Sequence, residues 1–239
     1  MNWRLYHKES TLSTNLDARQ GRPGDVFTAD EQTAGRGRLD HPWHSGKGEN
    51  LALSAVLDVT DLPAEHVATL PLMVGLGVAQ AVERLLGGRR TGIKWPNDVL
   101  VAGRKIAGIL CERHGERVIA GLGVNVNARR FPDAFAARAT SFALEGAANV
   151  PVAAVREAVL AELARLYPVW RGQGLSAFYA QIAERDVLKG KIVEVSQSAG
   201  DAQRVRGICG GIAPTGVLRV GDEPVYAGEA HILAISDLA

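Results

Sequence analysis

The alternation of apolar and polar residues in the first half of the chain is typical of short β-strands. Runs rich in Val, Ile and Leu, bounded by Gly, Asn or Asp, predict strands at 3–7, 25–32, 51–59, 91–95, 98–103, 104–113 and 117–126. The strands follow one another as hairpins do, and helical patterns lie elsewhere in the chain. We therefore expect an α+β fold, a mixed β-sheet with helices packed on one face, and not a regular βαβ alternation.

Apolar residues at helical spacing predict helices at 63–87, 150–170 and 174–188. Pro71 inside the first of these indicates a kink or a break between two helices. Residues 13–20 begin like a short helix, with Ser13 or Thr14 as the N-cap.

After Leu188 the pattern changes to short alternating strands with turn residues every several positions. This pattern is typical of a small β-barrel or sandwich. We therefore expect two domains, one over residues 1–187 and a smaller one over 188–239.

Composition narrows the class of protein. The chain has 239 residues, 46% of them hydrophobic, which is enough for a packed core, and a formal net charge of +1. A charge so near zero argues against binding to nucleic acid or to an anionic membrane surface. Cys111 and Cys209 suggest no disulfide framework. The first residues, "MNWRLYHKES", have no apolar core of signal-peptide length, and no apolar run reaches about 18 residues. We expect a cytoplasmic protein.

Positive charge is nevertheless concentrated in residues 33–50, "TAGRGRLDHPWHSGKGEN". A Walker loop needs Ser or Thr after its lysine, whereas Gly48 follows Lys47, and a dinucleotide fingerprint needs a third glycine that 121–126 lacks. In "GRGR" at 35–38, two guanidinium groups can face the same anion while the glycines let backbone N–H groups approach it. The alternative is a solvated surface loop.

A second polar cluster surrounds a Trp-Pro turn. Lys94, Asn97 and Asp98 lie about this turn, and Lys105 follows on the returning strand of a predicted hairpin. Lysines can bind phosphates, a carboxylate can ligate Mg²⁺ and an amide can contact a polar edge, so the cluster suits a nucleotide. The alternative is a hairpin with solvent-facing charges.

Five motifs together resemble those of biotin–protein ligases, in the same order and at similar spacing. They are "STN" (13–15), "EQTAGRGR" (31–38), "KWPND" (94–98), "RKIAGIL" (104–110) and "GLGVNVN" (121–127). The resemblance is detailed over residues 10–130. It extends more weakly to "RGICGGIAPTGVLRV" and "AGEAHIL", which are similar to the family's small SH3-like domain. It implies a class II synthetase-like catalytic domain followed by an SH3-like β-barrel.

The resemblance also implies a reaction in two steps. Biotin and ATP would give biotinyl-5′-adenylate, and the biotin would then pass to a lysine on the biotin carrier domain of a carboxylase. Arg36, Arg38 and Lys105 would offset the repulsion between the biotin carboxylate and the phosphates. The glycine-rich loop would then shield the adenylate from water.

Site residues follow from the resemblance position by position. Catalytic roles fall on Arg36, Arg38, Lys94, Asp98 and Lys105. Biotin contacts fall on Ser13, Thr14, Asn15, Gln32, Gly35, Arg36, Gly37, Arg38, Lys105, Gly108 and Gly121. Contacts with ATP or the adenylate fall on Arg36, Arg38, Trp43, Lys94, Asn97, Asp98, Lys105 and Asn125. Trp43 would pack by the adenine and Asn125 would lie near the purine edge. Mg²⁺ would be bound through the substrate phosphates, with Asp98 as a candidate ligand.

Several single residues have other interpretations. Ser13 can be a helix cap, His41 and His44 lack a third zinc ligand, and Cys111 suits packing better than nucleophilic catalysis. Asp40 and His41 stand where some family members have a further basic residue.

The function has alternatives too. Twelve residues before Ser13 are too few for a winged helix-turn-helix, so we expect no repressor function and no DNA binding. A lipoate- or octanoate-transferring enzyme of the same superfamily and a non-catalytic biotin sensor are the competing hypotheses. Both a monomer and a homodimer are compatible with the sequence.

Overall fold

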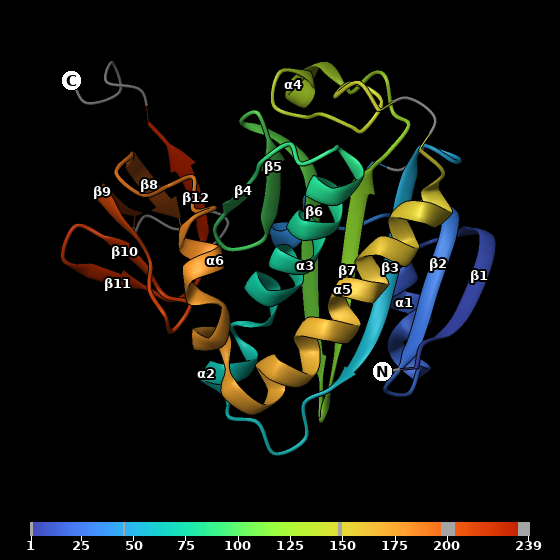
Figure 1. Cartoon of the computed structure of the whole chain (residues 1–239), viewed down its shortest axis with the longest axis horizontal. Helices are drawn as coiled ribbons and strands as arrows, with labels where there is room; N and C mark the ends of the chain where they lie inside the picture. The colour runs from blue at the N-terminus through green and yellow to red at the C-terminus, as the bar shows by residue number, and fades with distance from the viewer. Residues whose placement is uncertain (1, 45, 148–149, 197–203, 234–239) are drawn as a thin grey trace.

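The computed structural model describes residues 2–44, 46–147, 150–196 and 204–233. Within these residues the chain forms a seven-stranded mixed sheet, helices that pack on it, and a separate five-stranded sheet (Figure 1). The strand order in the large sheet is β1-β2-β3-β7-β6-β5-β4. Its strands are β1 (Arg4–Thr11), β2 (Asp25–Gln32), β3 (Asn50–Asp58), β4 (Thr91–Lys94), β5 (Asp98–Val101), β6 (Arg104–His114) and β7 (Arg117–Asn125). The β1–β2 pair is parallel and the other pairs are antiparallel. The predicted α+β class is confirmed.

Two long helices cover one face of this sheet (Figure 1). These are α3 (Leu70–Leu85) and α5 (Val152–Gln173), which pack on each other and on the sheet. The predicted break at Pro71 is confirmed, since the short helix α2 (Ala64–Val67) precedes α3 and Pro71 lies in the first turn of α3. Residues 64–85 are apolar enough to span a membrane by length and composition, but 72% of their most apolar window is buried in the fold.

Some predicted bounds are corrected. The helix predicted at 174–188 is a 3-10 turn, η3 (Leu175–Phe178), followed by the short helix α6 (Tyr179–Ala183). The strand predicted at 98–103 ends at Val101, because Ala102 and Gly103 both have positive φ and turn the chain into β6. The short helix α4 (Asp133–Ala136) was not predicted.

The opposite face of the sheet carries the short helices α1 (Thr14–Asp17) and η1 (Ala18–Gln20). Successive residues of a strand point to opposite faces, so Leu53 of β3 lies in the core with α3 while Ser54 bonds to residues of α1. The predicted short helix at 13–20 is therefore confirmed, and it brings polar side chains to the face that the long helices leave open.

The second sheet lies beyond the β4 edge of the first (Figure 1). It contains β8 (Ile192–Ser196), β9 (Arg204–Ile212), β10 (Leu218–Val220), β11 (Glu223–Val225) and β12 (Glu229–Ile232), in the order β11-β10-β9-β8-β12. All its pairs are antiparallel, and the change to short strands after Leu188 is as predicted. Trp95 Nε1 donates a hydrogen bond to the carbonyl of Gly216 at 3.0 Å and so ties the two sheets together. A domain boundary at 187/188 stays a prediction.

Candidate ligand-binding site

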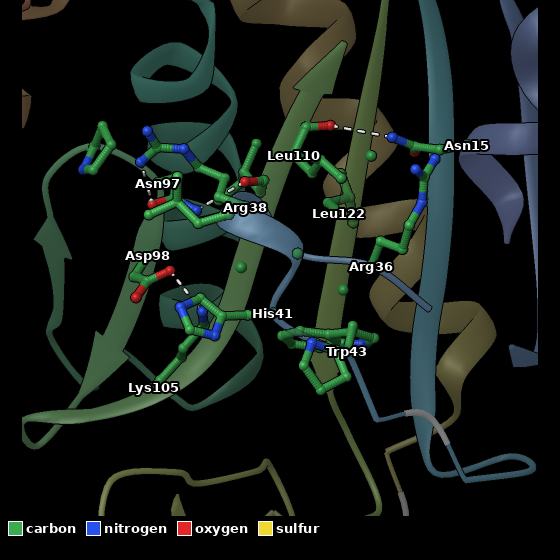
Figure 2. Close-up of a pocket in the computed structure, with 18 of the residues that line it drawn as sticks. Asn15, Arg36, Arg38, His41, Trp43, Asn97, Asp98, Lys105, Leu110 and Leu122 are labelled. Atoms are coloured by element: carbon green, nitrogen blue, oxygen red, sulfur yellow. Dashed lines mark hydrogen bonds and ion pairs between the residues drawn. The ribbon is translucent and has the colours of Figure 1, made fainter. Parts of the chain in front are cut away.

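The five motifs meet in one pocket on the face that α1 occupies (Figure 2). The pocket has an empty volume of about 850 Å³, which includes solvent space at its open mouth. The predicted residues that line it are Ser13, Thr14, Asn15, Gln32, Arg36, Gly37, Arg38, Trp43, Lys94, Asn97, Asp98, Lys105, Gly108 and Gly121. Segments separated by more than a hundred positions in the sequence therefore form one site.

Two predicted residues do not line the pocket. The nitrogen of the Asn125 amide donates to the carbonyl of Thr140 at 2.9 Å, and its oxygen accepts from Asn50 at 2.8 Å. This buried amide is engaged inside the protein, so its contact with a purine stays a prediction. Gly35 lies against the backbone of Trp43, where a Cβ would come within 2.5 Å of the Trp43 carbonyl oxygen.

A buried polar network forms the floor of the pocket. The oxygen of the Gln32 amide accepts from the backbone N–H of Thr14 at 2.8 Å. Ser54 Oγ lies 2.7 Å from Thr14 Oγ1 and 2.6 Å from Asn15 Oδ1. Ser13 stands at the N-cap of α1 but makes no side-chain capping hydrogen bond, so its hydroxyl can serve a ligand. Such a network suits a ligand with a neutral polar head.

Glycines permit two of the close contacts around this floor. A Cβ at Gly121 would lie 2.1 Å from Asn15 Oδ1, and a Cβ at Gly108 would lie 3.0 Å from Lys105 Nζ. The sequence interpretation gave these glycines the role of leaving space for the ligand. In the structure they also leave space for the side chains that form the site.

Two cations of the site pair with a carboxylate, and Arg38 contacts neutral oxygens. Lys105 Nζ is 2.7 Å from Asp98 Oδ1, and the Arg36 guanidinium is 3.6 Å from Glu112 Oε1. Arg38 donates to the carbonyl of Gly228 at 2.9 Å and to the Asn97 amide oxygen at 3.4 Å. Burial lowers the pKa of Arg38, and the negative charges of Glu229 and Asp98 oppose that shift. These cations can attract a polyanionic ligand.

Trp43 lies inside the pocket in the described conformation (Figure 2). A Cβ at Gly123 would lie 2.3 Å from the indole ring, and Lys105 Nζ is 5.7 Å from the ring centroid. The indole Nε1 is buried without a hydrogen-bond partner. Packing of Trp43 against adenine stays a prediction. Asp40 and His41 stand where some family members have a further basic residue. His41 Nε2 lies 3.5 Å from Glu229 Oε2, and the side chain of Asp40 is outside the described residues.

The residues of the site that sequence reasoning missed include Ser54, Glu112, Gly123 and Glu229. Ser54 could have been found from the sequence, because it is a polar residue inside an otherwise apolar strand. No local sequence pattern points to Glu229, because it comes from β12 of the second sheet.

The described residues contain no cluster of metal ligands, and the thiol of Cys111 is not reactive. No group of three His, Cys, Asp or Glu side chains there could hold a metal ion, and a metal bound through substrate phosphates needs no such group. Burial raises the pKa of Cys111 to about 12, so its thiol is protonated at neutral pH.

Comparison with known proteins finds similarity to one family. The family model described as "Biotin/lipoate A/B protein ligase family" matches residues 5–127. The bifunctional ligase/repressor BirA of Bacillus spizizenii is 38% identical over 144 residues, which are 57% of this chain and 44% of that protein. The chain thus spans about half the length of the BirA relatives from Bacillus. The biotin–[acetyl-CoA-carboxylase] ligase of Mycobacterium tuberculosis is 35% identical over 233 residues, 93% of this chain and 86% of that one.

A solved structure is similar over almost the whole chain. The biotin protein ligase from Aquifex aeolicus, in complex with biotin and ATP, superimposes with a TM-score of 0.85 and 26% identity. The match covers 96% of this chain and 98% of that chain, so it includes the second sheet.

Proposed function

Because the chain belongs to the biotin/lipoate A/B protein ligase family, we propose that it is an ATP-dependent biotin–protein ligase. It converts biotin and MgATP into biotinyl-5′-adenylate and transfers the biotin to a lysine on the biotin carrier domain of a carboxylase. The observation that carries the proposal is the convergence of Arg36, Arg38 and Lys105 on one pocket with a buried polar floor. Binding to a DNA operator is not part of the proposal.

In the first step an oxygen of the biotin carboxylate attacks the α-phosphorus of ATP. The new O–P bond forms as the bond from the α-phosphorus to the bridging oxygen breaks, and pyrophosphate leaves with both electrons of that bond. Two anions must meet, and the three cations lower the cost of bringing them together. Mg²⁺ bound to the phosphates of the substrate would neutralise part of the leaving group's charge, and Asp98 is the candidate protein ligand.

The polar floor fits the neutral ureido head of biotin. Ser13 and Thr14 offer hydroxyls, and the Asn15 and Gln32 amides are oriented by partners within the protein. A ligand without matching polar groups would leave these buried groups unpaired, which disfavours it. This argument separates biotin from lipoate, whose ring has no hydrogen-bonding head.

In the second step the amine of the acceptor lysine attacks the acyl carbon of the adenylate, and AMP leaves. The mixed anhydride is sensitive to water, so it needs cover until the acceptor arrives. Residues 35–43 lie across the pocket and supply Arg36, Arg38 and Trp43 to its lining. Arg38 also donates a hydrogen bond to the carbonyl of Gly228, the residue before β12. The covering loop is therefore held in part by the second sheet's own turn.

Pyrophosphate release tests the proposal. Purified protein is mixed with biotin and MgATP, and a protein-free sample is the control. We expect release that depends on biotin, followed by transfer of radiolabelled biotin to a purified carrier domain. Biotin-dependent release without transfer to any carrier domain would overturn the second step, and no release above the control would favour a non-catalytic sensor.

Isothermal titration with biotin and with lipoate distinguishes a biotin–protein ligase from a lipoate- or octanoate-transferring enzyme. We expect binding of biotin that is at least about 100-fold tighter, because the polar floor has no partner in lipoate. Tighter binding of lipoate would overturn the assignment in favour of a lipoate- or octanoate-transferring enzyme.

A further inference from the structure

Glu112 on β6 joins the floor of the pocket to the loop that covers it. Its Oε2 accepts a hydrogen bond from Asn15 Nδ2 at 2.6 Å, and its Oε1 lies 3.6 Å from the guanidinium of Arg36. Asn15 belongs to α1 and Arg36 to the loop after β2. Figure 2 shows the Arg36 side chain lying beside Asn15. One carboxylate therefore contacts both parts of the predicted biotin subsite.

The contact with Asn15 sets the orientation of its amide. A carboxylate can only accept, so the NH₂ group of Asn15 must face Glu112. The amide oxygen then faces Ser54 Oγ at 2.6 Å, and the side chain rests on Gly121, where a Cβ would lie 2.1 Å away. Asn15 is buried and Glu112 is largely covered, so this arrangement has little freedom.

The contact with Arg36 is of a different kind. Its distance of 3.6 Å and the 40% exposure of the Arg36 side chain describe an ion pair that water and salt can weaken. Among the described residues, Glu112 is the carboxylate with which Arg36 forms an ion pair. A second hollow beside the pocket shares Arg36, Gly37, Arg38, Leu39 and Leu110 with it and adds Glu112 to the lining. Glu112 thus stands where the loop meets the sheet.

An acidic side chain beside a site for anions needs a reason, since it repels the ligand. We propose that Glu112 is a positioning residue, which orients Asn15 for biotin and keeps Arg36 over the pocket before the substrates bind. It does not touch the reacting atoms. This inference rests on the proposed function for the ligand, but its effect on the loop exists without any ligand.

Glu112→Gln separates the two contacts. Glutamine keeps an oxygen that can accept from Asn15 but loses the charge that attracts Arg36. The matched control is Glu116→Gln, the same change at an exposed position of the same hairpin. Glu112→Ala removes both contacts, and if it fails to fold the glutamine variant still decides the question.

The first measurement is the rate of tryptic cleavage after Arg36 and Arg38 in the ligand-free protein. We expect cleavage about two- to fivefold faster in Glu112→Gln than in wild type, with the difference shrinking at high salt because the pair is exposed. A structural defect unrelated to this charge would not depend on salt in that way. Equal rates in Glu112→Gln and Glu116→Gln would overturn the role of Glu112 in anchoring Arg36.

The second measurement is the kinetics of pyrophosphate release. We expect the KM for biotin to rise about two- to fivefold in Glu112→Gln and about tenfold or more in Glu112→Ala, with kcat changed less than about twofold in the glutamine variant. An unchanged KM for biotin in both variants would overturn the role in biotin binding. Absence of release by the wild type would instead overturn the proposed function, and the ligand-free cleavage would still test the loop.

Discussion

Lys105 Nζ lies 2.7 Å from Asp98 Oδ1, although the strand register pairs Asp98 with Gly108 and Lys105 with Leu100. A register shift between Val99 and Leu100 and the missing side chain of Gly108 make this diagonal contact possible. A Cβ at Gly108 would lie 3.0 Å from both Lys105 Cε and Nζ. The irregular hairpin therefore directs a lysine into the pocket and supplies its counterion.

Lys105 and Asp98 are expected to act as a unit. Lys105→Ala should lower kcat for pyrophosphate release by about 100-fold or more, because a cation aimed at developing charge is lost. Asp98→Asn should lower it by about tenfold, since Lys105 loses the partner that directs it. The double variant should be little worse than Lys105→Ala alone, as expected for residues in contact. Effects that multiply in the double variant would show that the two residues act independently.

The pocket glycines should be sensitive to a single methyl group. Gly121→Ala would displace the Asn15 amide and should raise the KM for biotin, whereas Gly123→Ala would displace Trp43 and should raise the KM for ATP. Gly172→Ala is the matched control, since a Cβ there meets nothing within 4 Å and the residue lies in α5. It should leave both KM values unchanged and stabilise the protein by up to about 1 kcal/mol.

Steady-state kinetics with each substrate varied checks this division. If Gly121→Ala and Gly123→Ala both raise the KM of the same substrate, the floor and the Trp43 side of the pocket do not serve separate ligands. A control variant with altered KM would mean that the method reports stability and not the site.

The fold was predictable where local pattern and turn chemistry agree. The strand predicted at 25–32 is β2 to the residue, and the strands at 104–113 and 117–126 are within a residue of β6 and β7. Turn glycines and polar residues mark these ends in the sequence itself. The region at 174–188 was harder, because its apolar spacing is helical while the tertiary structure accommodates only two short turns.

The site was predictable where its residues lie in continuous motifs. Lys94, Asp98 and Lys105 come from one pair of hairpins, so their proximity follows from the strands. Glu229 reaches the pocket only because the second sheet packs beside the first, which no local pattern encodes. Asn125 is the opposite case: its motif is recognisable in the sequence, but its amide bonds to Asn50 and Thr140 inside the protein, and its contact with a purine stays a prediction.

Arg38→Gly should weaken retention of the adenylate. Arg38 supplies a positive charge to the pocket and bonds the loop to Gly228, and glycine removes both. We expect the half-life of the bound adenylate to fall about tenfold or more, because a partly buried hydrogen bond from a charged donor is lost. Released adenylate should then biotinylate lysines of a bystander protein, which a streptavidin blot measures. Arg130→Gly, an exposed arginine after β7, is the control. Full activity with strict acceptor choice in Arg38→Gly would contradict this account of the loop.

Glu83 should make the stability of the fold depend on acid pH. Burial would raise the pKa of this carboxyl, but hydrogen bonds from Arg185 and Thr91 outweigh burial and hold the pKa below its ordinary value of 4.5. A carboxyl with a lowered pKa stabilises the fold above its unfolded-state pKa, and that stability is lost as pH falls through the folded-state value. Glu83→Gln should therefore cost about 1.5–3 kcal/mol in urea unfolding near neutral pH, and progressively less below pH 4.5. Glu184→Gln, at an exposed neighbouring position, should cost little at either pH. A Glu83→Gln deficit that stays constant down to strongly acid pH would mean that packing, and not the charge held by Arg185, is what the variant loses.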